Sequence, residues 1–225
     1  MADTYYTLIT ALPHLPSLFK NKHLPITRIR LEERLRMLSE EDTKVLADIE
    51  NIYAWNKPGI EDGRIVTETT AALARVPHPD LQTVIERRLA LRTVVTALRY
   101  RLAGGTPGNA GRWGYRPWDR YIENHLQYPY FHMEHLMPWL PEVAELLNKG
   151  LSWELEKRLL AIEWEDHSRV AARHYFDFEA VALYVQRWHL IARWTGCAHT
   201  HAPALFEDLV AEAMVSSRPF LEHIS

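Results

Sequence analysis

Apolar residues recur at spacings of three and four positions from Ile26 onward, and this period is typical of α-helices. Sustained alternation of apolar and polar residues, which would indicate β-strands, is nearly absent. We therefore predict an all-α, multi-helix protein. The segments with helical period are 27–38, a stretch from Ser39 to the Pro58-Gly59 break, 65–76, 80–103, a proline-interrupted stretch 118–148, 152–173, 177–194 and 202–215.

Two of these segments carry start signals at their first residues. Ser39 is followed by three acidic residues, which favour the positive end of a helix dipole, and we expect the helix to begin there. Asp80 follows a Pro-His-Pro break and is the expected cap of the longest helix. The helix after Ser39 should bury one face, formed by Val45, Leu46, Ile49, Ile52 and Tyr53.

The domain organisation is predicted from the distribution of glycine. Residues 104–117 hold five of the nine glycines, a composition typical of a flexible connection. We expect a single helical domain, residues 1–225, in two packed lobes, 1–103 and 117–225, joined by a Gly/Pro-rich loop 104–116.

Three arginines interrupt the apolar face of the helix 80–103. Arg88, Arg92 and Arg99 fall near the middle of that face, where an unpaired guanidinium would be costly. They should meet carboxylates inside the protein or a surface supplied by another molecule. Asp166 replaces an apolar residue on the helix 152–173 and is the expected partner, so a structural ion pair is predicted among Arg88, Arg92 and Asp166.

The segment 112–121 interleaves arginines with aromatic residues. From Arg87 to Arg120 the chain has eight arginines and one aspartate, although its formal net charge is -3. Such residues anchor protein interfaces, and they can also stack on and clamp single-stranded nucleic acid. A loop folded onto its own helices is the remaining interpretation. The predicted partner-binding residues are Arg112, Trp113, Tyr115, Arg116, Trp118 and Arg120.

Composition narrows the class of protein further. The hydrophobic share of 47% is that of a folded globular chain, and the net charge predicts no general attraction to nucleic acid or anionic lipid. The single cysteine, Cys197, fits a reducing compartment, and no apolar run reaches the length needed to span a bilayer. A cytoplasmic location is expected, peripheral to the inner membrane through partners.

Motifs for catalysis are weak. His125, His132 and His135 form the sharpest histidine cluster, near Glu134 and followed by the Glu163 and His167 pair, and they leave metal-dependent hydrolysis as an alternative. Prolines interrupt the segment, and no His-Glu-x-x-His string, phosphate-binding loop or Gly-x-Ser-x-Gly elbow occurs. We expect no enzymatic activity, no catalytic residues, no metal and no cofactor.

A family resemblance adds to this interpretation. The chain resembles an uncharacterised bacterial family that is encoded beside V/A-type ATP synthase genes and is distantly similar to the C subunit of those machines, the equivalent of the eukaryotic d subunit. The matching residues are Tyr5-Tyr6-x-Leu8, Ala11-Leu12-Pro13-x-Leu15, Thr96-Ala97-Leu98-Arg99 and, within the block Leu159 to Trp194, Ala161-Ile162-Glu163-Trp164, Tyr175-Phe176-Asp177-Phe178-Glu179 and Ile191-Ala192-Arg193-Trp194.

The resemblance implies a helical, non-catalytic protein that seats the central rotor shaft on the membrane ring and passes torque between them. Its partners would be the proteins of the central stalk and the ring. Nucleic-acid binding through 112–121 is the alternative function, and metal-dependent hydrolysis is the second alternative.

Overall fold

The computed structural model describes residues 5–20, 23–53, 62–105 and 113–197, and within these ranges the chain forms helices and no strands. The predicted all-α class is confirmed. The elements are α1 (Tyr6–Ala11), the 3-10 helix η1 (Leu18–Lys20), α2 (Arg28–Leu35), α3 (Glu40–Tyr53), α4 (Asp62–Leu73), α5 (Pro79–Leu102), α6 (Trp118–Glu123), α7 (Leu140–Asn148), α8 (Ser152–Ala171) and a final helix over residues 178–197.

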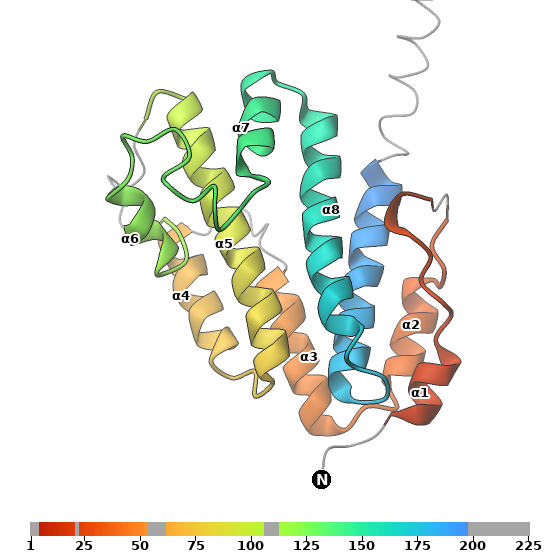
Figure 1. Cartoon of the computed structure of the whole chain (residues 1–225). Coiled ribbons are helices and arrows are strands. Elements are labelled where there is room, and N and C mark those ends of the chain that lie inside the picture. Colours follow the sequence, from red (N-terminus) through yellow and green to blue (C-terminus); the bar gives the residue numbers. More distant parts are fainter. Residues whose placement is uncertain (1–4, 21–22, 54–61, 106–112, 198–225) are drawn as a thin grey trace, which may run out of the picture.

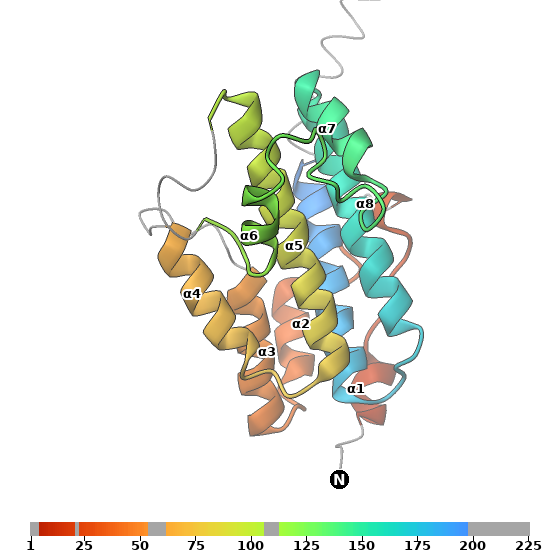
Figure 2. The same cartoon turned by 60° about the vertical axis from the view of Figure 1, so that its left-hand side comes forward.

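The long helix α5 runs through the middle of the molecule (Figures 1 and 2). α3 and α4 cover one side of it, and α7 and α8 cover another. The final helix, drawn in blue, lies beside α8 and faces the N-terminal helices α1 and α2. The first and last described parts of the chain are therefore neighbours in space.

Local side-chain bonds explain where several helices begin. Thr27 accepts a hydrogen bond from the Arg30 amide at 3.4 Å, and Ser39 accepts one from the Asp42 amide at 3.1 Å. The start predicted at Ser39 is confirmed. The cap predicted at Asp80 is not found, because α5 begins one residue earlier at Pro79, in the first turn where proline needs no amide hydrogen.

The hydrophobic core consists of two clusters that share helices. The first joins the N-terminal helices, the start of α5 and the final helix, while the second joins the rest of α5 with α6 and α7. α8 contributes Leu160 to the first and Ile162 to the second. The clusters therefore do not divide at 104–116 as the two predicted lobes would, because the C-terminal helix packs with the N-terminal ones.

Other predicted helix boundaries differ from those in the structure or lie outside the described residues. The stretch 118–148 is not one helix, since residues 124–139 form turns between α6 and α7. The predicted break at Pro58-Gly59, the helix 202–215 and residues 106–112 of the predicted linker lie outside the described ranges. None of the helices in the described part of the chain is long and apolar enough to cross a membrane.

Candidate functional site

A buried ion pair links α5 to α8. Arg88 pairs with Glu163, and their side chains are only 10% and 8% exposed. The Arg88 guanidinium also lies over the ring of Tyr53 at the end of α3, 4.1 Å from its centroid. One arginine therefore holds three helices in register at the centre of the molecule.

His167 completes this centre as a neutral histidine. Its Nδ1 bonds the backbone carbonyl of Glu163, so Nδ1 carries the proton and Nε2 accepts from the Tyr53 hydroxyl at 3.0 Å. Burial, the largest cause, and the charges of Arg88 and Arg187 lower the pKa of His167 to about 3. His167 is therefore a structural core residue, with both ring nitrogens used inside the protein.

The predicted internal pairing of Arg88 is present, but the carboxylate is a different one. Asp166, the predicted partner, contacts Arg87 at 3.4 Å and Arg169 at 3.0 Å. Glu163 lies one turn before Asp166 on α8, and its longer side chain reaches the interior where Arg88 lies. Asp166 and Arg92 line different cavities.

A cavity of about 690 Å³ opens on one side of this pair, and we call it the arginine cavity. Four guanidiniums line this cavity, three from α5 and one from the final helix. Its described lining also includes two carboxylates, and both come from α8. These charged residues are Arg88, Arg92, Arg99, Arg193, Glu156 and Glu163.

The two carboxylates of the arginine cavity are already engaged. Glu163 pairs with Arg88, and Glu156 binds Arg193 through two hydrogen bonds of 2.6 and 3.0 Å. Burial, the largest cause, and the neighbouring guanidinium of Arg88 lower the pKa of Arg92 to about 9. Arg92 stays charged at neutral pH, so the described lining of the cavity keeps an excess of two positive charges.

A second cavity, of about 720 Å³, lies on the other side of the Arg88–Glu163 pair. We call it the balanced cavity, because the four arginines among its lining residues face four carboxylates. Its apolar part includes Trp118, Trp139 and Met137. The charged residues are Arg87, Arg88, Arg158, Arg169, Glu86, Glu163, Glu165 and Asp166.

The segment predicted to contact partners is largely folded onto α5. Trp113 is 6% exposed, and its indole N–H donates to Glu123 at 2.8 Å, so it does not lie on the surface as that prediction requires. The amide of Tyr115 donates to Thr93 of α5 at 2.9 Å. Trp118 is partly buried against the second core cluster.

Two arginines of this segment do face solvent. Arg120 is exposed, and Arg116 is half-exposed and lies 3.8 Å from the carboxylate of Asp119. Arg112 lies outside the described residues. A contact with a protein or with nucleic acid through Arg116 and Arg120 stays a prediction, but the ring of Trp113 is buried and that of Trp118 is only partly exposed.

The rings of His125 and His132 lie side by side with centroids 5.8 Å apart, but among the described residues these two do not form a group of three ligands with His135. His125 stacks on Tyr121 with ring centroids 4.2 Å apart, and His132 packs against Tyr128 at 3.5 Å. His135 is exposed. Among the described residues, the group whose ligand atoms all lie within 4.8 Å of one another is a different one, His174, Asp177 and Glu179.

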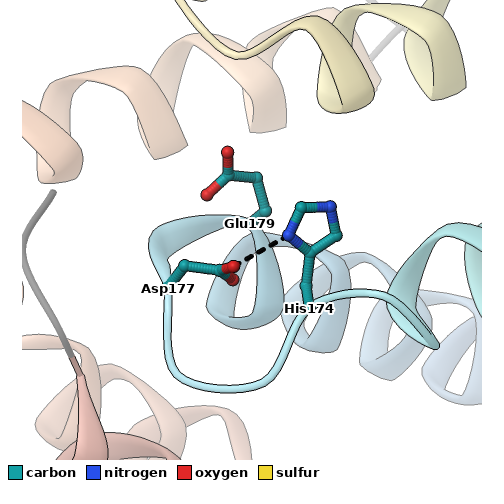
Figure 3. Close-up of side chains that lie close together, drawn as sticks. All are labelled: His174, Asp177 and Glu179. Carbon is teal, nitrogen blue, oxygen red and sulfur yellow. Dashed lines mark hydrogen bonds and ion pairs between the residues drawn. The ribbon is translucent and has the colours of Figure 1, made fainter.

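His174 and Asp177 of this group lie in the turn before the final helix, and Glu179 lies in its first turn (Figure 3). Asp177 caps that helix by accepting from the Ala180 amide at 2.9 Å, and its other oxygen bonds His174 at 2.8 Å. Glu179 bonds His78 at 3.0 Å. Each of the three side chains has a protein partner, so capping and ion pairing account for the cluster.

His174 joins this turn to the start of α5. Its second ring nitrogen lies 2.9 Å from the carboxylate of Asp80. Burial of the imidazole opposes its charge, but hydrogen bonds to Asp177 and Asp80 outweigh burial and raise the pKa of His174. An imidazolium with two carboxylate acceptors is the state that satisfies both nitrogens.

Three residues that line the arginine cavity were not predicted from the sequence as parts of one site: Glu156, Glu163 and Arg193. Glu156 and Arg193 lie 37 positions apart, and neither interrupts an apolar face as Arg88 does. The sequence placed Glu163 one turn from His167 and in a family-like motif, but not opposite Arg88. The sequence signal for this cluster of guanidiniums is that every basic residue of α5 is an arginine and none is a lysine.

Comparisons of the chain with protein-family models, with curated proteins and with solved structures found no match.

Proposed function

We propose that this chain is a non-catalytic docking component of a V/A-type ATP synthase, similar to the C subunit of such machines, which seats the central rotor shaft on the membrane ring. The support is the resemblance of its opening segment and its C-terminal block to the family encoded beside those genes. The observation that carries the proposal is that these segments, about 170 positions apart, pack against each other.

The contacts between the two segments are specific. The Tyr5 amide donates to the Phe176 carbonyl at 2.6 Å, and the rings of Tyr6 and Phe176 are 4.3 Å apart. The Tyr184 hydroxyl donates to the Pro13 carbonyl at 2.8 Å. The two matching segments therefore lie together in the fold, as motifs inherited with one fold would.

Exposed aromatic residues at this junction offer a docking surface. Tyr6 is 57% exposed and Tyr175 is 69% exposed, although each belongs to a matching motif. Large aromatic side chains that stay in solvent are typical anchors of protein interfaces. We assign them to contact with a rotary subunit on the cytoplasmic side of the membrane, where the chain is held by partners.

The test is co-purification from the native host. The tagged chain, recovered from gently solubilised membranes, should bring down the central-stalk subunits of the V/A-type ATP synthase, identified by mass spectrometry. The double variant Tyr6→Ser, Tyr175→Ser should fold normally and lose these subunits, because both side chains are mainly solvated in the free chain.

Tyr128→Ser is the matched control, since Tyr128 is also exposed, at 39%, and lies in the turns between α6 and α7. It should retain the rotary subunits. Recovery of the folded chain without any rotary subunit would refute the proposed function, and equal loss by both variants would refute the assigned surface.

A further inference from the structure

We propose that the arginine cavity binds a small phosphorylated organic anion. This site is separate from the docking surface and does not depend on the proposed function. Its charge is the first argument. The four guanidiniums that line it face two carboxylates, and both carboxylates are already paired, with Arg88 and with Arg193. The described lining residues therefore carry two more positive charges than negative ones.

The arrangement of the arginines fits phosphate. Arg92 lies one helical turn after Arg88, and Arg99 lies three turns after Arg88. All three side chains therefore project from the same face of α5. Guanidinium groups present paired N–H donors that match two oxygens of a phosphate. More than one of these guanidinium groups would donate hydrogen bonds to a phosphate bound along this face. The negative charge of the phosphate would reduce the repulsion among the guanidiniums.

A buried donor at the wall of the cavity is a second, independent observation. The Nε–H of Arg88 has no acceptor among the residues that the structure describes, although the side chain is nine-tenths buried. A buried donor without an acceptor is costly, and such groups in native proteins call for an explanation. Arg88 lines both cavities, and we assign the missing acceptor to an anionic oxygen in the arginine cavity, where the described lining has an excess of positive charge.

The rest of the lining points to an organic phosphate. Leu91, Val95, Leu159 and Leu160 supply apolar surface, and the Thr96 hydroxyl and the Tyr53 ring lie at the same cavity. Its volume of about 690 Å³ is that of a pocket for a small molecule. Apolar walls beside a cationic end suit a ligand that has a carbon skeleton and one phosphorylated end.

The balanced cavity serves as an internal comparison. It has a similar volume, about 720 Å³, and shares Arg88 and Glu163 with the arginine cavity, but its four arginines face four carboxylates. It therefore offers an anion no net attraction. Of these two cavities, we assign anion binding only to the arginine cavity.

The test is calorimetric titration of the full chain with ribose 5-phosphate and with pyrophosphate, with ribose and sulfate as controls. Arg99→Gln is the first variant, because Arg99 is exposed and its loss should leave the fold intact. Hydrogen bonds to charged groups predict a loss of affinity of about tenfold or more. Arg92→Gln is the second variant, with the same expected loss.

Arg34→Gln is the matched control, since Arg34 is an exposed arginine on α2 that does not line the cavity. One-to-one binding of ribose 5-phosphate that weakens in Arg99→Gln and not in Arg34→Gln supports the proposal. The proposal is overturned if ribose 5-phosphate does not bind at millimolar concentration, or if pyrophosphate, ribose or sulfate binds as well as ribose 5-phosphate. It is also overturned if Arg99→Gln and Arg34→Gln bind ribose 5-phosphate equally well. Co-purification with rotary subunits is unaffected by any of these outcomes.

Discussion

At the contact between Arg88 and Glu163, two ions share a space from which water is largely excluded, since their side chains are 10% and 8% exposed. Arg88→Ala leaves the Glu163 carboxylate buried without its cation. We expect a loss of about 3–5 kcal/mol in the free energy of unfolding, measured by urea denaturation.

Arg28→Ala is the control for this prediction. Arg28 pairs with Glu32 at 2.7 Å, but both side chains are more than half exposed. Surface pairs contribute at most about 1 kcal/mol, so this variant should unfold close to the parent chain. Equal effects of the two substitutions would show that the Arg88 pair is not buried in solution.

The buried state of His167 gives a prediction about pH. Its pKa is lowered from 6.5 to about 3, so the unfolded chain binds a proton at pH values where the folded chain does not. The stability contributed by the neutral imidazole is complete above pH 6.5 and is lost progressively as the pH falls toward 3. Nitrogen NMR at a pH of about 5, between these two pKa values, should find His167 neutral, with the proton on Nδ1. Titration of this imidazole near its ordinary pKa would contradict the arrangement.

The sequence could indicate that Arg88 needs a partner but not which one. Its position on an apolar face showed that the guanidinium would be buried, and burial of a charge requires a counter-ion. The choice between Glu163 and Asp166 depends on the rotation of α8 about its axis and on side-chain length. Those are properties of the packed helices, and a helical wheel drawn from one segment does not contain them.

At the scale of elements, the loop after α5 is held against that helix by close packing at Gly114. A Cβ atom on Gly114 would lie 2.5 Å from Thr93 Cγ2 and 3.2 Å from Asp119 Cβ. Thr93 is 3% exposed and β-branched, so it has little room to move. Gly114→Ala should destabilise the protein by about 1–3 kcal/mol in thermal or denaturant unfolding.

Gly105→Ala is the matched control at the other end of the same loop. There the atoms of described residues that lie within 4 Å of a new Cβ belong to Tyr100, at ordinary contact distances of 3.6 and 3.9 Å. The change should stay within about 0.5 kcal/mol. If Gly114→Ala were equally well tolerated, the segment 113–120 would not be seated on Thr93 as described.

Helix starts were predictable where a short polar side chain does the capping. Ser39 and the acidic residues after it mark α3 because a cap acts within three residues, a range that the sequence shows directly. The partner-facing interpretation of Trp113 failed for the opposite reason. Its burial depends on Glu123 and on the second core cluster, which only the folded chain brings to it.

At the scale of the whole molecule, the two core clusters share α5 and α8, so we expect them to unfold together. Trp188 belongs to the first cluster and Trp113 to the second. In a chain labelled with fluorotryptophan, the fluorine NMR signals of both residues should change at the same urea concentration, as two-state unfolding requires. Separate transitions would restore the division into lobes at 104–116.

The all-α class was predictable from the period of the apolar residues, whereas the arrangement of the helices was not. Helical period identifies the buried face of each segment but not the segment it faces. The contact of Trp188 with the Ile26 carbonyl, at 2.8 Å and across 162 positions, illustrates the missing information. The Gly-rich loop suggested a boundary at 104–116, but the two core clusters do not divide there, because the final helix packs with the N-terminal helices.

The proposed place of the chain in a rotary machine is tested most directly by electron cryo-microscopy of the V/A-type ATP synthase purified from the native host. Our account predicts density for this helical bundle between the central shaft and the membrane ring, with Tyr6 and Tyr175 at a contact with one of the rotary proteins. A complex with shaft and ring complete, and with no density for this chain between them, would contradict the account.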